Sequence, residues 1–238
     1  MPGVFTIEWT AAWRRRRALL LSVFVPLGLV GLLAFGGAPP RHAVVVYTVL
    51  FTLFGLFGSA IPWIRDAESG LLARIFWTGL DPRRILGART AAGTLVDVLE
   101  LIPSAAAVVL AGAPDTEVGA HLLIHLAVAL LAANLIGFWI ATLARSIAEA
   151  ALLCAATGLL LLHAAGVFRP PPAHGPWSAL AEFSPFHGLH AALAAAAGAG
   201  TGRMPHSGIE VTVTAALLAV SLAASRPLLR HLTTPAAA

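Results

Sequence analysis

The sequence predicts an all-α polytopic membrane protein with six transmembrane helices. Of its 238 residues 58% are hydrophobic and only 11% are charged, and the mean hydropathy is +0.86. A soluble domain carries about 25% charged residues, and its surface is too large to hide this much apolar area. These values exclude an ordinary globular enzyme, and they also exclude a disordered chain. We interpret residues 1–238 as a single transmembrane domain.

Six apolar segments are long enough to cross a hydrocarbon layer, which takes about 20 helical residues. They cover residues 18–37, 43–64, 90–113, 120–144, 149–167 and 209–226. The preceding residues, 1–17, predict an amphipathic elbow helix in the membrane interface. Phe5, Trp9 and Trp13 recur there at helical spacing, and tryptophan favours the headgroup level.

The arginines predict the orientation, because cytoplasmic connections of membrane proteins are enriched in basic residues. All fifteen basic residues are arginines. With the N-terminus in the cytoplasm, twelve lie inside, and only Arg41, Arg169 and Arg203 lie outside. We therefore expect both termini and the connection 65–89 to be cytoplasmic, and residues 168–208 to be external.

The external stretch is expected to contain short re-entrant helices before the last span rather than a further span. Pro170, Pro171 and Pro172 make its start rigid and non-helical, and Pro185 interrupts the helical stretch that follows. Neither piece is long enough to cross the membrane.

The absence of lysine excludes an ATPase site of the P-loop type, whose lysine reaches the phosphates. We therefore expect no cofactor in this chain; if it works with ATP and Mg²⁺, a partner subunit binds them. The single cysteine, Cys154, excludes an intramolecular disulfide and a cysteine metal cage. The net charge of +4 does not indicate nucleic acid, because the arginines flank apolar segments.

Two groups of ionisable residues lie within apolar segments. Asp97 and Glu100 are one turn apart in the third segment, where charges are costly and usually functional or paired. The alternative, which their position favours, is that they reach the cytoplasmic interface or an arginine there. His121 and His125 have a spacing that could share a metal, but no third ligand is visible. We expect a solvated histidine pair at the outer face and no metal site.

The stretch from Arg65 to Arg89 resembles the cytoplasmic connection of ABC transporter permeases of the ABC type-2 (exporter) family. The family pattern is an acidic residue, a glycine, a leucine-rich stretch with a basic residue, and a turn before the next span. The residues that fit are Glu68, Gly70, Leu72, Arg74, Thr78, Leu80 and Leu86. Departures are Gly79 in place of proline, Leu71 in place of threonine and Arg89 in place of lysine. The elbow and Ser184-Pro185-Phe186 before the last span also match the family, so the resemblance covers nearly the whole chain.

The resemblance implies a permease that pairs with a second permease, as a homodimer or heterodimer, and binds a separate ATPase subunit. An amphipathic helix in the connection would fill a groove on that subunit. The contact is expected to involve Glu68, Gly70, Leu72, Arg74, Ile75, Phe76 and Thr78. A substrate path is expected at the interface between the two permeases, lined by the second and fifth spans. Its candidate residues are Gly55, Gly58, Ser59 and Thr157.

Three alternatives compete with an exporter subunit. One is a haem-exporter-type permease of cytochrome maturation, against which the long external stretch argues. Another is an intramembrane enzyme using Asp97, Glu100 or the histidine pair, which bound metal or activity without ATP would favour. The third is a structural anchor, which the arginine-rich connection disfavours. The Ala-, Gly- and Arg-rich composition suggests a GC-rich bacterial genome, and we therefore expect the chain in a bacterial cytoplasmic membrane. The apolar walls suit lipids, hydrophobic drugs or peptides alike.

Overall fold

A computed structural model describes residues 3–14, 16–112, 116–170, 175–199 and 208–233. In these ranges the chain forms ten helices and no strand, which confirms the all-α prediction. The helices are α1 (Val4–Arg14), α2 (Arg16–Phe35), α3 (Pro40–Glu68), α4 (Leu71–Trp77), α5 (Pro82–Gly112), α6 (Thr116–Leu143), α7 (Ile147–Ala164), α8 (Pro176–Glu182), α9 (Pro185–Ala196) and α10 (Gly208–Thr233). The expected rigid start of the external stretch falls partly on Pro171 and Pro172, which lie outside the described ranges.

Five of these helices, α3, α5, α6, α7 and α10, are long and apolar enough to cross a membrane. The remaining expected span corresponds to α2, whose apolar part, Leu19–Phe35, is at the short end of the range for spanning. Each of the six predicted segments is therefore helical. The largest difference is at α5, which begins at Pro82 rather than near residue 90. Asp81 and Pro82 explain this start, because the Asp81 side chain accepts from Arg83 N at 3.2 Å and proline suits a first turn.

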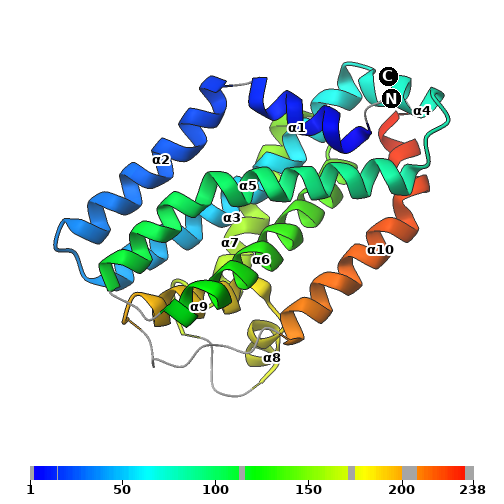
Figure 1. Ribbon diagram of the computed structural model, residues 1–238. Helices are drawn as coiled ribbons and strands as arrows, with labels where there is room; N and C mark the ends of the chain where they lie inside the picture. Colours follow the sequence, from blue (N-terminus) through cyan, green and yellow to red (C-terminus); the bar gives the residue numbers. More distant parts are fainter. Residues whose placement is uncertain (1–2, 15, 113–115, 171–174, 200–207, 234–238) are drawn as a thin grey trace.

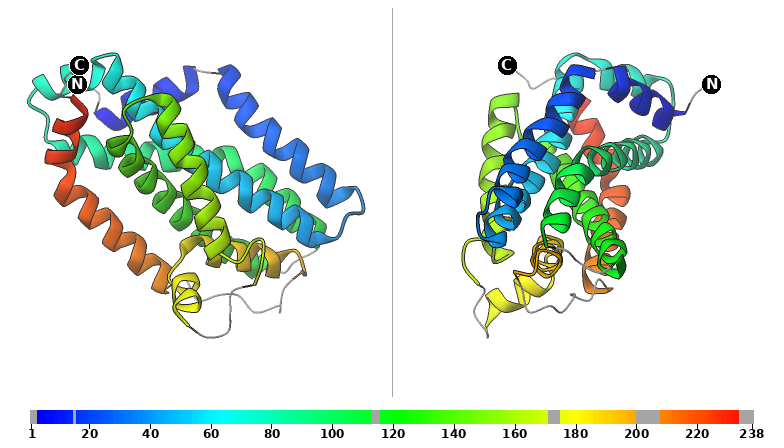
Figure 2. Two further views of the ribbon diagram at one scale, coloured as in Figure 1. Left: turned by 180° about the vertical axis from the view of Figure 1, so that it is seen from behind. Right: turned by 60° about the vertical axis from the view of Figure 1, so that its left-hand side comes forward.

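The long helices form one bundle, with α2 and α10 on opposite flanks (Figure 1). Two further views show α1 and α4 at one end and α8 and α9 at the other (Figure 2). The α4 end is also where α10 ends. Residues 65–89 and the described parts of 168–208 thus lie at opposite ends, as the arginine distribution requires.

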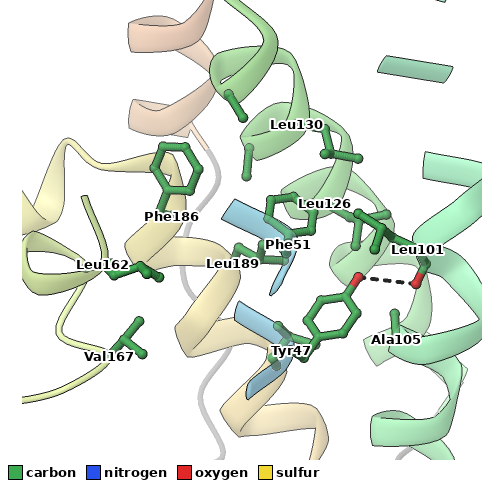
Figure 3. Close-up of a cluster of buried hydrophobic side chains, with 14 of the residues drawn as sticks. Tyr47, Phe51, Leu101, Ala105, Leu126, Leu130, Leu162, Val167, Phe186 and Leu189 are labelled. Carbon is green, nitrogen blue, oxygen red and sulfur yellow. Dashed lines mark hydrogen bonds between the residues drawn. The ribbon is translucent and has the colours of Figure 1, made fainter. Parts of the chain in front are cut away.

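The core lies where α3, α6 and α9 meet. Tyr47 and Phe51 of α3 are fully buried against Leu126 and Leu130 of α6 (Figure 3). The Tyr47 hydroxyl donates to the carbonyl oxygen of Leu101 at 3.3 Å, which joins α3 to α5. The buried hydroxyl needs a hydrogen-bond partner within the protein, because a buried polar group without one is destabilising.

The two short helices of the predicted external stretch are separate elements. Both α8 and α9 begin with a proline in the first turn, and the chain turns between them at Phe183 and Ser184. Phe186 and Leu189 of α9 are fully buried in the same core as α3 and α6. The predicted break at Pro185 is therefore present, and α9 closes this end of the bundle. Its re-entrant position in a membrane stays a prediction.

Two glycines allow α3 and α6 to pack closely. A Cβ atom at Gly55 would lie 2.7 Å from Ala133 Cβ. A Cβ atom at Gly137 would lie 2.7 Å from the carbonyl oxygen of Leu56 and 2.8 Å from Ser59 Cβ. Because the obstacle at Gly137 is backbone, the helices cannot relax by a rotamer change.

We predict that Gly137→Ala lowers the free energy of unfolding by about 1–3 kcal/mol, the usual effect of overpacking. Thermal unfolding of the purified protein in detergent, followed by tryptophan fluorescence, measures this. Gly31→Ala in α2 is the matched control, because no atom lies within 4 Å of the added methyl group. Equal unfolding temperatures for the two variants would contradict the proposed close contact.

Candidate functional site

The connection between the second and third apolar segments folds into a short helix held between two turns. Ser69 and Gly70 separate α3 from α4, and Gly70 has φ of 70°, a left-handed conformation that favours glycine. Thr78 ends α4, with its hydroxyl donating to the Ile75 carbonyl oxygen at 2.6 Å. Gly79, also left-handed at φ 77°, then leads to α5. The predicted helix is therefore present.

One face of α4 is packed against its own chain. Leu72 is fully buried in a cluster with Trp63, Leu86 and Leu229, from α3, α5 and α10. Ile75 and Phe76 are half-buried against the same cluster. The expectation that Leu72 fills a groove on a partner is therefore corrected, since this side chain has no free surface.

The opposite face of α4 is exposed and apolar. Trp77 at the end of α4 is 85% exposed, and Leu71 at its start and Leu80 after its end are also exposed. Glu68 and Arg74, expected at the rim of a contact, are exposed as well. Sequence reasoning missed Trp77, although a tryptophan in a predicted cytoplasmic connection is the available signal. The amphipathic pattern shows two apolar faces and cannot say which one faces the bundle.

Arg89 joins this end of the bundle to the elbow helix. Its guanidinium group is only 9% exposed and forms an ion pair with Asp66 at the end of α3. It also lies 3.6 Å from the Glu8 carboxylate of α1 and 4.2 Å above the centre of the Trp63 ring. Along α1 itself, Phe5 stacks on Trp9, and Trp13 meets Trp9 edge-on. The position of α1 in the membrane interface stays a prediction. Arg89 thus connects α1, α3 and α5.

Beyond Arg89 a cavity of about 650 Å³ lies between α1, α2, α3, α5 and α6. Asp97 and Glu100 both line this cavity. They follow Arg89 on α5 by eight and eleven residues, which at the rise of an α-helix is about 12 Å and about 16 Å along the axis. Asn134 of α6 donates its side-chain amide to Asp97 at 2.8 Å, and the Ser22 hydroxyl of α2 hydrogen-bonds Glu100. In the described ranges their partners are therefore an amide and a hydroxyl, which corrects the interpretation that they reach an arginine.

The four residues expected along a substrate path do not come together. Gly55 is packed on α6, and the Ser59 hydroxyl donates to the carbonyl oxygen of Asn134 at 2.7 Å. Gly58 and Ser59 line the cavity beside Asp97, whereas Thr157 is half-buried on α7. The close approach that small residues were expected to allow is present, but it joins helices of the same chain. A path between two permeases stays a prediction.

The histidine pair of the fourth segment is divided between two environments. His121 is exposed, whereas His125 is fully buried and its Nδ1 atom lies 2.7 Å from the Glu210 carboxylate of α10. The expectation of a solvated pair is therefore wrong for His125. Gly188 of α9 covers the Glu210 carboxylate, and any side chain there would collide with it. Within the described ranges, no group of three or more metal-ligating residues occurs.

His190 supports the same end of the bundle as a neutral side chain. Burial and, to a lesser extent, the nearby His187 lower the pKa of His190 to about 4. The Thr48 hydroxyl already donates to the Val44 carbonyl oxygen at 2.8 Å. It therefore accepts from His190 Nδ1, which lies 3.1 Å away. This bond attaches α9 to α3.

The family model described as "ABC-2 type transporter" matches residues 4–196. The match runs from the first residue of α1 to the last residue of α9, and it includes α4 and the cavity. No curated protein sequence matches the chain.

We predict that Arg89→Met lowers the free energy of unfolding by about 3 kcal/mol, because the half-buried Asp66 carboxylate loses its closest and most buried partner. Adding Asp66→Asn should recover part of this loss, since the orphaned charge is removed. Chemical unfolding in detergent measures both effects. Arg83→Met is the control, because Arg83 is exposed at the same end of α5. An Arg89→Met variant as stable as Arg83→Met would contradict the role of the ion pair.

Proposed function

The chain belongs to the ABC-2 type transporter family, and from this premise we propose that it is the membrane subunit of an ATP-driven exporter. It is a multi-pass membrane protein and a permease component of an ABC transporter. We infer that it pairs with a second permease, either a copy of itself or a different chain. ATP and Mg²⁺ then bind to a separate ATPase subunit.

The observation that carries this proposal is the exposed apolar face of α4. Trp77 and Leu71 belong to a helix of only 7 residues at the end of the bundle, and Leu80 follows that helix; all three side chains are exposed. A large exposed aromatic side chain beside charged residues is typical of a protein contact, where tryptophan supplies much of the binding energy. Glu68 and Arg74 would lie at its rim and contribute less individually. We propose that this face binds the ATPase subunit.

The buried face of α4 supplies the mechanical connection that an ATP-driven subunit needs. Leu72, Ile75 and Phe76 attach α4 to a cluster that also contains residues of α3, α5 and α10. A displacement of α4 by the ATPase would therefore move three spanning helices together. Such rigid-body shifts can open a path alternately to each side of the membrane. Gly70 and Thr78 fix the ends of α4 and transmit the displacement.

We further propose that the α4 end faces the cytoplasm of a bacterial cell and that both termini lie there. The arginines at this end support the orientation, because positive residues are retained on the cytoplasmic side. The end with α8 and α9 would then face outward.

The contact predicts different effects for two exposed tryptophans. Trp77→Ala should reduce co-purification with the co-expressed ATPase subunit at least tenfold, because losing a buried aromatic anchor costs about 2 kcal/mol or more. Trp177→Ala is the matched control, because Trp177 is 58% exposed on α8 at the opposite end. Gly70→Val should also weaken the contact, through strain at a left-handed residue. Unchanged ATPase binding by both α4 variants would overturn the proposed contact.

The orientation predicts which cysteines an impermeant maleimide reaches on whole cells. In a Cys154→Ala background, Ala179→Cys on α8 should be labelled, and Ser69→Cys beside α4 should react only after the membrane is permeabilised. Both positions are exposed in the structure, so burial does not protect either of them. Labelling at position 69 in intact cells would reverse the proposed orientation.

A further inference from the structure

We propose that the cavity lined by Asp97 and Glu100 binds an amphipathic organic cation. This inference rests on the proposed exporter function and names the chemical class of its cargo. The site lies within one chain, between α1, α2, α3, α5 and α6, rather than at an interface between two permeases.

The cavity has the size and the walls of a small-molecule site. Its volume of about 650 Å³ falls within the range of ligand pockets, which runs from about 300 to 1,000 Å³. Leu19, Val25, Phe54 and Val96 provide apolar surface from α2, α3 and α5. These walls suit an apolar ring system, while polar and charged residues from α1, α2, α3, α5 and α6 line the rest of the cavity.

The site holds two carboxyl groups that have no basic partner among the residues that the structure describes. Asp97 and Glu100 form no ion pair with any residue in the described ranges. Arg89, which lines the same cavity, is paired with Asp66 and Glu8, and Arg65 lies 3.7 Å from Asp66. A carboxylate within a membrane helix is costly without a counter-charge, and the basic groups nearby are already used. A cationic ligand would supply that counter-charge.

Asn134 adds an unused acceptor to the two carboxylates. Asn134 is only 3% exposed. Its side-chain amide group donates to Asp97, to Thr94 and to the Leu130 carbonyl oxygen. The side-chain oxygen of Asn134 receives no hydrogen bond from the described residues, and it lies beside Gly93, which lines the cavity together with Asn134. It can therefore accept from an N–H group of a ligand whose positive charge lies beside Asp97.

Gly58 leaves the carboxylate of Asp97 uncovered. A Cβ atom at Gly58 would lie 3.7 Å from Asp97 Oδ1, and no other side chain in the described ranges would come within 4 Å of it. The space in front of this oxygen is consequently open to a ligand. Glu210 differs in this respect, because its carboxylate is paired with His125 and covered by Gly188. The acid that is already satisfied therefore lies outside the cavity.

Ethidium is a suitable probe, because it combines a permanent positive charge, apolar rings and amino N–H groups. Its fluorescence on binding to the purified permease in detergent gives an affinity without ATP or a partner subunit. We expect saturable binding by the natural protein and at least tenfold weaker binding by Asp97→Asn and by Glu100→Gln. Glu182→Gln, an exposed acid on α8, is the matched control and should bind normally. Phenanthridine, the uncharged ring system, should not displace ethidium.

A second variant tests the cavity without removing a charge. Gly58→Leu places a side chain in front of Asp97, keeps both acids and should weaken ethidium binding at least tenfold. Its unfolding temperature should match that of Glu182→Gln, since the first added atom meets no close neighbour. This variant decides the matter if an acid variant fails to fold.

Three outcomes would overturn the proposed site. The first is that the natural protein shows no saturable binding of ethidium. The second is that the Asp97→Asn/Glu100→Gln double variant or Gly58→Leu binds ethidium with unchanged affinity. The third is that phenanthridine displaces ethidium as well as an unlabelled cation of the same ring system does. Failure here is distinguishable from failure of the exporter proposal. Loss of ATPase binding in Trp77→Ala together with normal ethidium binding in every variant would reject the cation site alone. Normal ATPase binding by Trp77→Ala together with weakened ethidium binding by the acid variants would reject the ATPase contact alone.

Discussion

The guanidinium group of Arg89 requires partners, and much of the molecule is arranged around that requirement. A charge with so little exposure is tolerated only when it is paired and hydrogen-bonded. Asp66 and Glu8 provide the charges, and the Trp63 ring covers the planar face. Since these residues come from α1, α3 and α5, one side chain fixes the elbow helix against two spanning helices. The same cluster closes one end of the cavity and neutralises the basic groups there.

Two acidic sites in the bundle show how differently it surrounds a carboxylate. Glu210 bonds to His125 and is sealed by Gly188, so it joins α6, α9 and α10 as a structural contact. Asp97 and Glu100 are hydrogen-bonded by neutral groups only, and they face open space. Because these neutral groups supply no counter-charge, the second arrangement supports the proposal of a cationic ligand. The difference lies in packing, since all three residues are ordinary carboxylic acids.

The short helix α4 combines attachment and exposure in seven residues. Its inner face is held by the cluster around Leu72, and its outer face presents Trp77. An element that only joined two spans would need neither feature. Attachment would make α4 move with α3, α5 and α10, and exposure leaves Trp77 free for the proposed contact with the ATPase subunit. The cavity lies between helices of the same bundle, so a motion that begins at α4 would reach its walls.

The sequence by itself determined the helical class, the six apolar segments, the elbow and the short helix between two glycine turns. Apolar length, aromatic spacing and glycine position are local properties, and the physics of a membrane leaves helices as the main solution. Only the tertiary structure decided which face of α4 is buried, because Leu71 and Leu72 are equally apolar. It also decided that His125 meets Glu210, 85 residues away in the chain. Contacts of this kind depend on how helices are rotated and packed against one another, and neighbouring residues in the sequence carry no record of that rotation.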